Sequence, residues 1–81
     1  MLTLTYAIVS RINKLLEEKG MTMYKLSEES GISYSTIKTI MQRKTNNIEL
    51  RTVILLANGF GLTVSEFLDD SAFLVDNLDI Y

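Results

Sequence analysis

The sequence contains no cysteine and no histidine, and these two absences limit the catalytic and metal-binding sites that it can form. Without cysteine there can be no disulfides, no thiolate metal ligands and no cysteine nucleophile. Without histidine the commonest general base and metal ligand is missing as well. The chain also lacks a glycine-rich phosphate-binding loop, and its carboxylates are scattered along the expected helices. We therefore expect neither an enzyme nor a bound metal or cofactor.

Proline is absent too, and no apolar run approaches the roughly 18 residues that a membrane span needs. The opening segment MLTLTYAIVS lacks the basic start and the small-residue cleavage site of a signal peptide. We therefore expect a cytoplasmic protein with no membrane contact. The chain has 81 residues, of which 47% are hydrophobic, and no proline-rich linker or repeat. These properties predict one small compact domain.

Charge is unevenly distributed along the chain. All eight basic residues lie in residues 1–51, together with five acidic ones, so this part carries a net charge of +3. Residues 52–81 carry five acidic residues and no basic one, so their net charge is −5. This division predicts that the first part of the chain meets an anion, while the last part faces solvent or a protein partner.

Apolar residues recur at helical spacing between turn residues, which predicts an all-α fold. Five helices are expected, over residues 6–19, 23–30, 34–43, about 49–60, and 63 to about 69 or 70. Their N-caps are expected at Thr5, Thr22, Ser33 and, in a capping box with Glu66, Thr63. The fourth helix, which contains LRTVILLANGF, is apolar nearly all round and is expected to lie at the centre of a compact five-helix domain.

The last eleven residues, SAFLVDNLDIY, are both apolar and acidic. We divide the chain into a domain of residues 1–70 and a C-terminal extension of residues 71–81. Phe73, Leu74 and Val75 are consecutive, so a helix or a strand would point them to different faces and leave apolar side chains exposed to water. We expect the extension to pack against the domain, or against the same segment of a second protomer.

The most informative stretch is TMYKLSEESGISYSTIKTI, residues 22–40. Two short helices joined by a glycine turn cross steeply, which requires a small residue on the first helix, a left-handed residue in the turn and apolar anchors on both. The residues that meet these requirements are Ser27, Gly31, Leu26, Ile37 and Ile40. The second helix then presents a wholly polar outer face.

This stretch resembles the helix-turn-helix of the phage repressor/Cro-type (Xre-like) family. The resemblance covers about residues 8–69: RINKLLEEKGMT is similar to the family's first helix, KLSEESGIS and STIKTI to its helix-turn-helix, and LANGFGLTVSEFL to its fourth helix and the start of its fifth. It implies a sequence-specific regulator of transcription, expected to be a repressor, that binds double-stranded DNA with its third helix in the major groove.

The resemblance also assigns roles to individual residues. Base contacts are expected from Tyr34, Ser35, Lys38 and Thr39. Phosphate contacts are expected from residues at helix ends and in the following loop, namely Thr22, Lys25, Arg43, Lys44, Asn46, Asn47 and Arg51.

Met23 stands where the family often has a polar amide, and we expect it to be buried beside Met21 or to contact sugar. Three alternatives remain open: that Tyr34 packs over the turn, that Lys38 is a solvated surface charge, and that Lys25 is a tolerated surface charge. Arg11 and Lys14 are expected mainly to be surface charges on the first helix, with contact to the DNA backbone as the alternative.

A single helix-turn-helix covers only a half-site, so a homodimer is expected. The surface predicted for it lies on the fifth helix and the extension, and comprises Phe67, Phe73, Leu74 and Leu78. The acidic residues of the extension would repel DNA, so this surface should lie away from the recognition helix. The alternative function is a protein-interaction module on the same fold, such as an antitoxin or anti-repressor.

Overall fold

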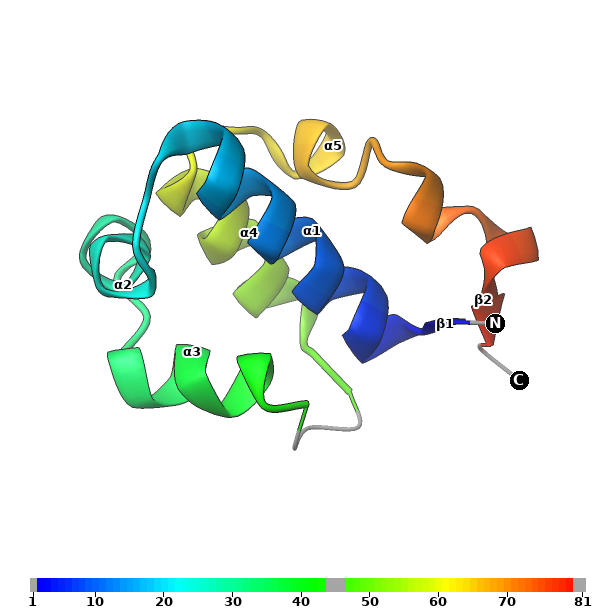
Figure 1. The fold of residues 1–81 in the computed structure, drawn as a ribbon, viewed down its shortest axis with the longest axis horizontal. Coiled ribbons are helices and arrows are strands. Elements are labelled where there is room, and N and C mark those ends of the chain that lie inside the picture. Colours follow the sequence, from blue (N-terminus) through cyan, green and yellow to red (C-terminus); the bar gives the residue numbers. More distant parts are fainter. Residues whose placement is uncertain (1, 44–46, 80–81) are drawn as a thin grey trace.

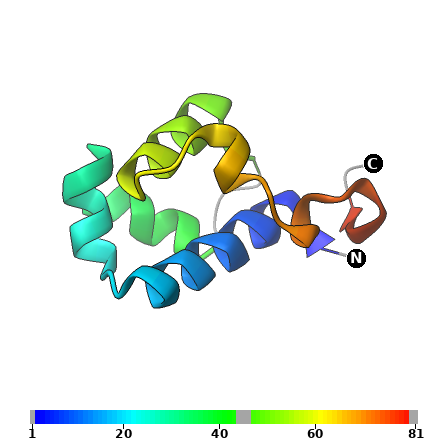
Figure 2. The ribbon, with the colours of Figure 1, turned by 90° about the horizontal axis from the view of Figure 1, so that it is seen from above.

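The structure is a computed structural model that describes residues 2–43 and 47–79. Its elements, in chain order, are β1 (Leu2–Thr3), α1 (Leu4–Lys19), α2 (Met23–Ser30), α3 (Tyr34–Met41), α4 (Leu50–Gly59), α5 (Val64–Phe67), the 3₁₀ helices η1 (Ser71–Phe73) and η2 (Val75–Asn77), and β2 (Leu78–Asp79). The five α-helices confirm the predicted all-α class. The two views place α2 at one end of the molecule and the strands β1 and β2 at the other (Figures 1 and 2).

Helix α1 begins earlier than the sequence predicts. Its N-cap is Thr3, whose hydroxyl oxygen accepts a hydrogen bond of 3.1 Å from the N–H of Tyr6. Thr5 lies inside the helix and is buried, so the predicted cap at Thr5 is wrong. The helix ends at Gly20 in the left-handed conformation, with φ of 61°, as expected for a C-terminal glycine.

The turn between α2 and α3 is built as the sequence predicts. Thr22 and Ser33 cap the two helices, and Gly31 adopts the left-handed conformation with φ of 76°. The hydroxyl of Ser27 donates to the carbonyl of Ile32 over 2.8 Å, and the hydroxyl oxygen of Ser30 accepts from the N–H of Ile32 over 3.1 Å. These bonds satisfy the backbone of the turn and fix the start of α3.

Helices α2 and α4 cross closely at Gly59. A Cβ atom added there would lie 2.8 Å from the Cβ of Ser30 and 3.0 Å from a methyl group of Leu26, so no side chain fits without movement. Helix α4 carries core residues, as expected of the central helix, but two of its apolar residues, Leu50 and Ile54, lie on an exposed face.

Two helices are shorter than the sequence predicts. Helix α3 ends at Met41, and Arg43, two residues later, has a left-handed φ of 56°. Helix α5 ends at Phe67, although its N-terminal capping box between Thr63 and Glu66 forms as predicted.

The C-terminal extension folds back onto its own domain. The ring of Phe73 packs on that of Phe67 at a centroid distance of 6.3 Å, and η1 contacts α1. Strand β2 pairs in parallel with β1, with Leu2 opposite Leu78. The first predicted alternative, packing on the domain, thus holds for residues 71–79. Residues 80 and 81 lie outside the described part of the chain.

The length and apolar character needed to cross a membrane are not combined in any helix of residues 2–43 and 47–79.

Candidate nucleic-acid interface

Helix α3 presents a polar face to the outside. Ile37 and Ile40 are buried against the core, so the opposite face of the helix is exposed. The exposed residues on it include Ser35, Lys38, Thr39 and Gln42. Tyr34 stands at the first helical position with 42% of its surface exposed. The fold therefore brings the four predicted base contacts together on one helix, which lies at the edge of the molecule (Figure 1).

The hydrogen-bonding capacity of this face is only partly used within the protein. The hydroxyl of Thr39 donates to the carbonyl of Ser35 over 2.9 Å, which leaves its oxygen lone pairs free to accept. Lys38 forms no ion pair with any residue that the structure describes. An exposed cation and hydroxyl oxygens that can still accept hydrogen bonds can pair with the edges of bases in the major groove, which present both acceptors and donors.

At the start of α2, the side chains of two predicted phosphate contacts, Thr22 and Lys25, already bind groups within the protein. The hydroxyl oxygen of Thr22 accepts from the N–H of Lys25 over 3.1 Å and so caps the helix. The ammonium of Lys25 lies 3.0 Å from a carboxylate oxygen of Glu29, one turn on. The hydrogen bond to Glu29 raises the pKa of Lys25. A phosphate would have to compete with Glu29 for this lysine. Met21 and Met23, as expected, are half-buried against the core.

The end of α3 positions a second basic group. The guanidinium carbon of Arg43 lies 5.0 Å from the centre of the Tyr6 ring, which comes from the first turns of α1. This cation–π contact holds the arginine beside a hollow of about 260 Å³, which Ser10 and Asn13 also line. Asn47 and Arg51 are exposed further along the chain. Lys44 and Asn46 lie outside the described residues.

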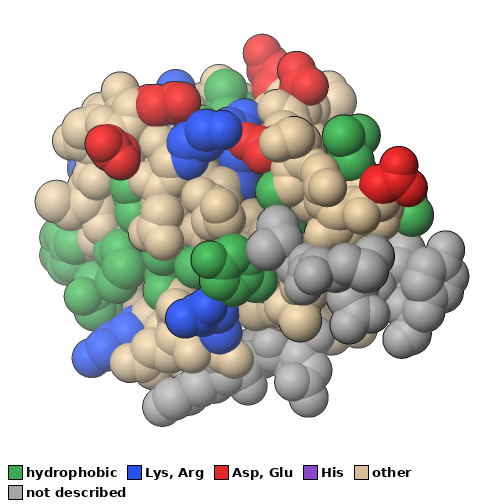
Figure 3. Space-filling view, turned by 45° about the vertical axis from the view of Figure 1, so that its right-hand side comes forward, with side chains coloured by type: hydrophobic (Ala, Val, Ile, Leu, Met, Phe, Trp, Pro, Cys, Tyr) green, Lys and Arg blue, Asp and Glu red, His purple; other side chains and the backbone are tan. Residues whose placement is uncertain are grey.

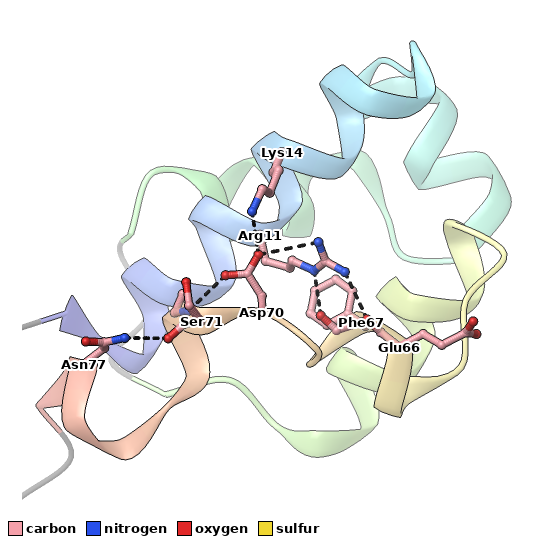
Figure 4. A network of polar contacts seen from close by, with 8 residues as sticks. Arg11, Lys14, Glu66, Phe67, Asp70, Ser71 and Asn77 are labelled. Atoms are coloured by element: carbon pink, nitrogen blue, oxygen red, sulfur yellow. Dashed lines mark hydrogen bonds and ion pairs between the residues drawn. The ribbon is translucent and has the colours of Figure 1, made fainter.

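Arg11 and Lys14 have a structural role that the sequence did not reveal (Figure 4). Arg11 donates to the carbonyl oxygens of Phe67, over 2.7 Å, and Glu66, over 3.0 Å. Its guanidinium also lies 3.6 Å from a carboxylate oxygen of Asp70, and the same oxygen accepts from Lys14 over 2.9 Å. We name these three residues, Arg11, Lys14 and Asp70, the α1 clasp, because they bind α1 to the end of α5.

The α1 clasp keeps Asp70 charged. The N–H of Ala72 donates to Asp70 over 2.9 Å, and this bond, together with those from Lys14 and the charge of Arg11, lowers the pKa of Asp70 below its usual value. Partial burial opposes the shift but does not cancel it. The clasp thus fixes the point from which the extension begins.

Acidic and basic side chains are unevenly distributed over the surface. On the face drawn in Figure 3, the acidic side chains lie in the upper half, and the charged side chains in the lower half are all basic. Helix α3 lies at the lower edge in the same vertical orientation (Figure 1). The basic part of this face favours the approach of a polyanion.

The four residues predicted for a dimer surface do not share one environment. Phe67 is fully buried and packs against the rings of Phe60 and Phe73, and Leu78 is buried within the extension itself, in strand β2. Their side chains are not available at the protomer surface, which corrects the expectation for these two. Phe73 is half-buried, whereas Leu74 is 60% exposed.

Sequence reasoning missed two aromatic residues near this interface. Tyr6 holds Arg43, and Tyr24 on α2 lies against Tyr34 on α3. Both contacts join segments whose proximity depends on the tertiary fold, so helical periodicity gives no signal for them. The only hint that the sequence gave for Tyr24 was a tyrosine within the helix-turn-helix stretch, residues 22–40.

Comparison with known families agrees with this geometry. A family model for the Cro/C1-type HTH DNA-binding domain matches residues 11–72, a range that includes α2 to α5 and most of α1. No curated protein and no solved structure matches the chain. The family match confirms the resemblance drawn from the sequence motifs. Because it covers well over half of the residues, the chain belongs to the Cro/C1-type helix-turn-helix DNA-binding family.

Proposed function

We propose that this protein is a sequence-specific DNA-binding repressor of transcription that inserts α3 into the major groove. The observation that carries the proposal is the exposed face of α3, where Ser35, Lys38 and Thr39 are free of carboxylate partners among the described residues. Side chains of this kind pair with base edges. Occupancy of a site that overlaps a promoter suffices to exclude another protein, so repression is the simplest outcome of binding.

In this proposal, base contacts and phosphate contacts come from different residues. Tyr34, Ser35, Lys38 and Thr39 read bases, because they lie on the outer face of the recognition helix. Phosphates along the backbone are bound by Thr22, Lys25, Arg43, Asn47 and Arg51, together with Lys44 and Asn46, which lie outside the described residues. Phosphate contacts supply affinity and register, whereas base contacts supply sequence preference.

Fluorescence anisotropy with labelled duplexes at several salt concentrations tests this division. Arg43→Ala and Lys44→Ala should weaken binding to all sequences alike and reduce the slope of log affinity against log salt by about one unit per lost phosphate contact. Lys38→Ala and Ser35→Ala should change which sequence is preferred. Lys14→Ala is the matched control, since it removes the same charge from the α1 clasp and should leave both the slope and the preference unchanged. A change of base preference in Arg43→Ala, but not in Lys38→Ala, would contradict the placement of α3.

We also propose that the protein binds DNA as a homodimer. Two recognition helices about 34 Å apart would fit successive major grooves on one face of the duplex. Leu74 and Val75 support a contact through the extension, because they are adjacent and are 60% and 55% exposed. Half-buried Phe73 borders them.

The exposed apolar face of α4, which includes Leu50 and Ile54, is the alternative dimer surface against which the extension can be tested. In sedimentation velocity experiments, Leu74→Glu should yield a monomer while Leu50→Glu remains dimeric. The reverse result would move the interface to α4. A wild-type protein that is monomeric at high concentration, with and without DNA, would refute the dimer.

The rival function, a protein-interaction module such as an antitoxin or anti-repressor, predicts a different binding profile. It would place the partner on the acidic and apolar extension and would leave duplex binding weak and independent of α3. Salt-dependent DNA binding that is lost when α3 is altered therefore distinguishes the two functions.

A further inference from the structure

Two exposed tyrosines meet where α2 and α3 begin. Tyr24 stands in the first turn of α2, and Tyr34 is the first residue of α3. Their ring centroids are 6.3 Å apart, and the ring planes are inclined by 49°. The exposed fraction is 64% for Tyr24 and 42% for Tyr34. This separation and tilt are those of a favourable aromatic pair.

The pair lies next to the residues proposed to contact bases. Ser35 follows Tyr34 directly, and Lys38 lies one helical turn further along α3. Neither tyrosine ring is needed to fill the core, which is completed by residues such as Leu26 and Ile37. Large aromatic surface left in water on one side of a small domain is costly, and it is explained if an apolar group covers it when the domain binds its partner.

The major groove offers one such apolar group. Thymine carries a methyl group at C5, whereas the edges of the other bases in the groove carry only donors, acceptors and ring hydrogens. A tyrosine ring at the tip of a recognition helix can pack on this methyl group, and a second ring behind it limits the rotation of the first.

We infer that Tyr24 and Tyr34 act as one aromatic surface that selects a thymine at the base pair facing the start of α3. Tyr34 contacts the methyl group. Tyr24 is a positioning residue that holds the Tyr34 ring and adds apolar area at its edge. This inference rests on the proposed DNA-binding function, and it names a feature of the half-site.

Replacement of thymine by deoxyuridine tests the inference, because this change removes only the methyl group. In a duplex that the full-length protein selects from a random pool, each thymine is replaced in turn and the affinity is measured by anisotropy. One position in each half-site should weaken wild-type binding by about fourfold, the effect of one buried methyl group. The loss should vanish in Tyr34→Ala and should shrink in Tyr24→Ala.

Conservative variants separate the ring from its hydroxyl group. Tyr24→Phe and Tyr34→Phe should retain the methyl effect, since both rings remain. A structural role alone for Tyr24 would lower the melting temperature of Tyr24→Ala and leave the methyl effect intact, which would overturn its positioning role. The wild-type scan does not depend on the folding of any variant.

The outcomes distinguish this inference from the proposed function. Salt-dependent binding to a selected duplex with no methyl effect at any thymine would overturn the inference and leave the proposed function standing. A methyl effect that persists in Tyr34→Ala would also overturn it. Failure to bind any duplex would refute the proposed function and the inference together.

Discussion

Basic side chains in this protein meet two kinds of surroundings. In the α1 clasp, Arg11 and Lys14 bind Asp70 and backbone carbonyls at the end of α5. On α3, Lys38 has no carboxylate partner among the described residues, and Arg43 rests on an aromatic ring. The same residue types thus stabilise the fold in one region and remain available to a polyanion in the other. Surroundings, and not charge alone, determine which basic residues can bind DNA.

Removal of the whole extension should have the largest effect. A chain that ends at Asp70 loses Leu78 and the Phe73 ring and exposes Phe67, so we expect a loss of about 3 to 6 kcal/mol in the free energy of unfolding. Denaturant unfolding measures it, and Phe73→Ala provides a milder variant. Association should weaken, while the half-site preference of any folded fraction stays the same. Unchanged association and melting temperature would refute this account of the extension.

Arg11→Ala should have the next largest effect on stability. It leaves two carbonyl oxygens and Asp70 without their guanidinium partner, which should cost about 2 to 3 kcal/mol. Lys38→Ala is the matched comparison and should change the unfolding free energy by less than about 0.5 kcal/mol, because its side chain is exposed. In DNA selection the two variants should behave the other way round. Lys38→Ala should prefer a different sequence from wild type, whereas Arg11→Ala should keep the wild-type preference. Equal stability of the two variants would remove the distinction between the regions.

Asp70 should make the α1 clasp sensitive to acid. Since the folded protein lowers the pKa of Asp70, its contribution to stability is present above the ordinary pKa near 3.8 and is lost as the pH falls through the lower, folded value. At neutral pH, Asp70→Asn should lose about 1 to 2 kcal/mol. The difference from wild type should shrink below about pH 4 in urea unfolding. The neighbouring exposed Asp69→Asn serves as control, and a gap that stays constant with pH would contradict the role of this carboxylate.

Tyr6→Ala should have the smallest effect, on DNA affinity. A cation–π contact at an exposed site contributes about 0.5 to 1 kcal/mol, so release of Arg43 should weaken binding about two- to fivefold for all sequences. Tyr6→Phe keeps the ring and should bind like wild type. In a Tyr6→Ala/Arg43→Ala double mutant, the Tyr6 change should add nothing further. Full additivity of the two changes would show that the ring does not act through Arg43.

Features that depend on neighbours in the sequence were predictable, except for the N-cap of α1, which lies at Thr3 and not at Thr5. Thr22, Ser33 and the Thr63 capping box act through bonds to residues three positions away, and Gly31 supplies a conformation that its own lack of a side chain permits. Local chemistry determines all four. The polar face of α3 follows in the same way from helical periodicity.

Features that depend on tertiary contacts were not predictable. Arg11 reaches carbonyls at the far end of the domain, and Phe67 is buried because Phe73 returns to cover it. Strand β2 exists only because the extension passes beside β1. An apolar residue near the C-terminus indicates burial but does not say whether its own domain or a second protomer provides the cover. That ambiguity explains why Phe67 and Leu78 were expected at a dimer surface.

Selection of duplexes from a random pool by the full-length protein tests the central claim most directly. The account predicts enrichment of one sequence as two inverted half-sites whose centres lie about 10 base pairs apart, with a preference that changes in Lys38→Ala and persists in Lys14→Ala. A pool that shows no enriched sequence, or an enriched sequence that Lys38→Ala binds as wild type does while Lys14→Ala does not, would contradict it.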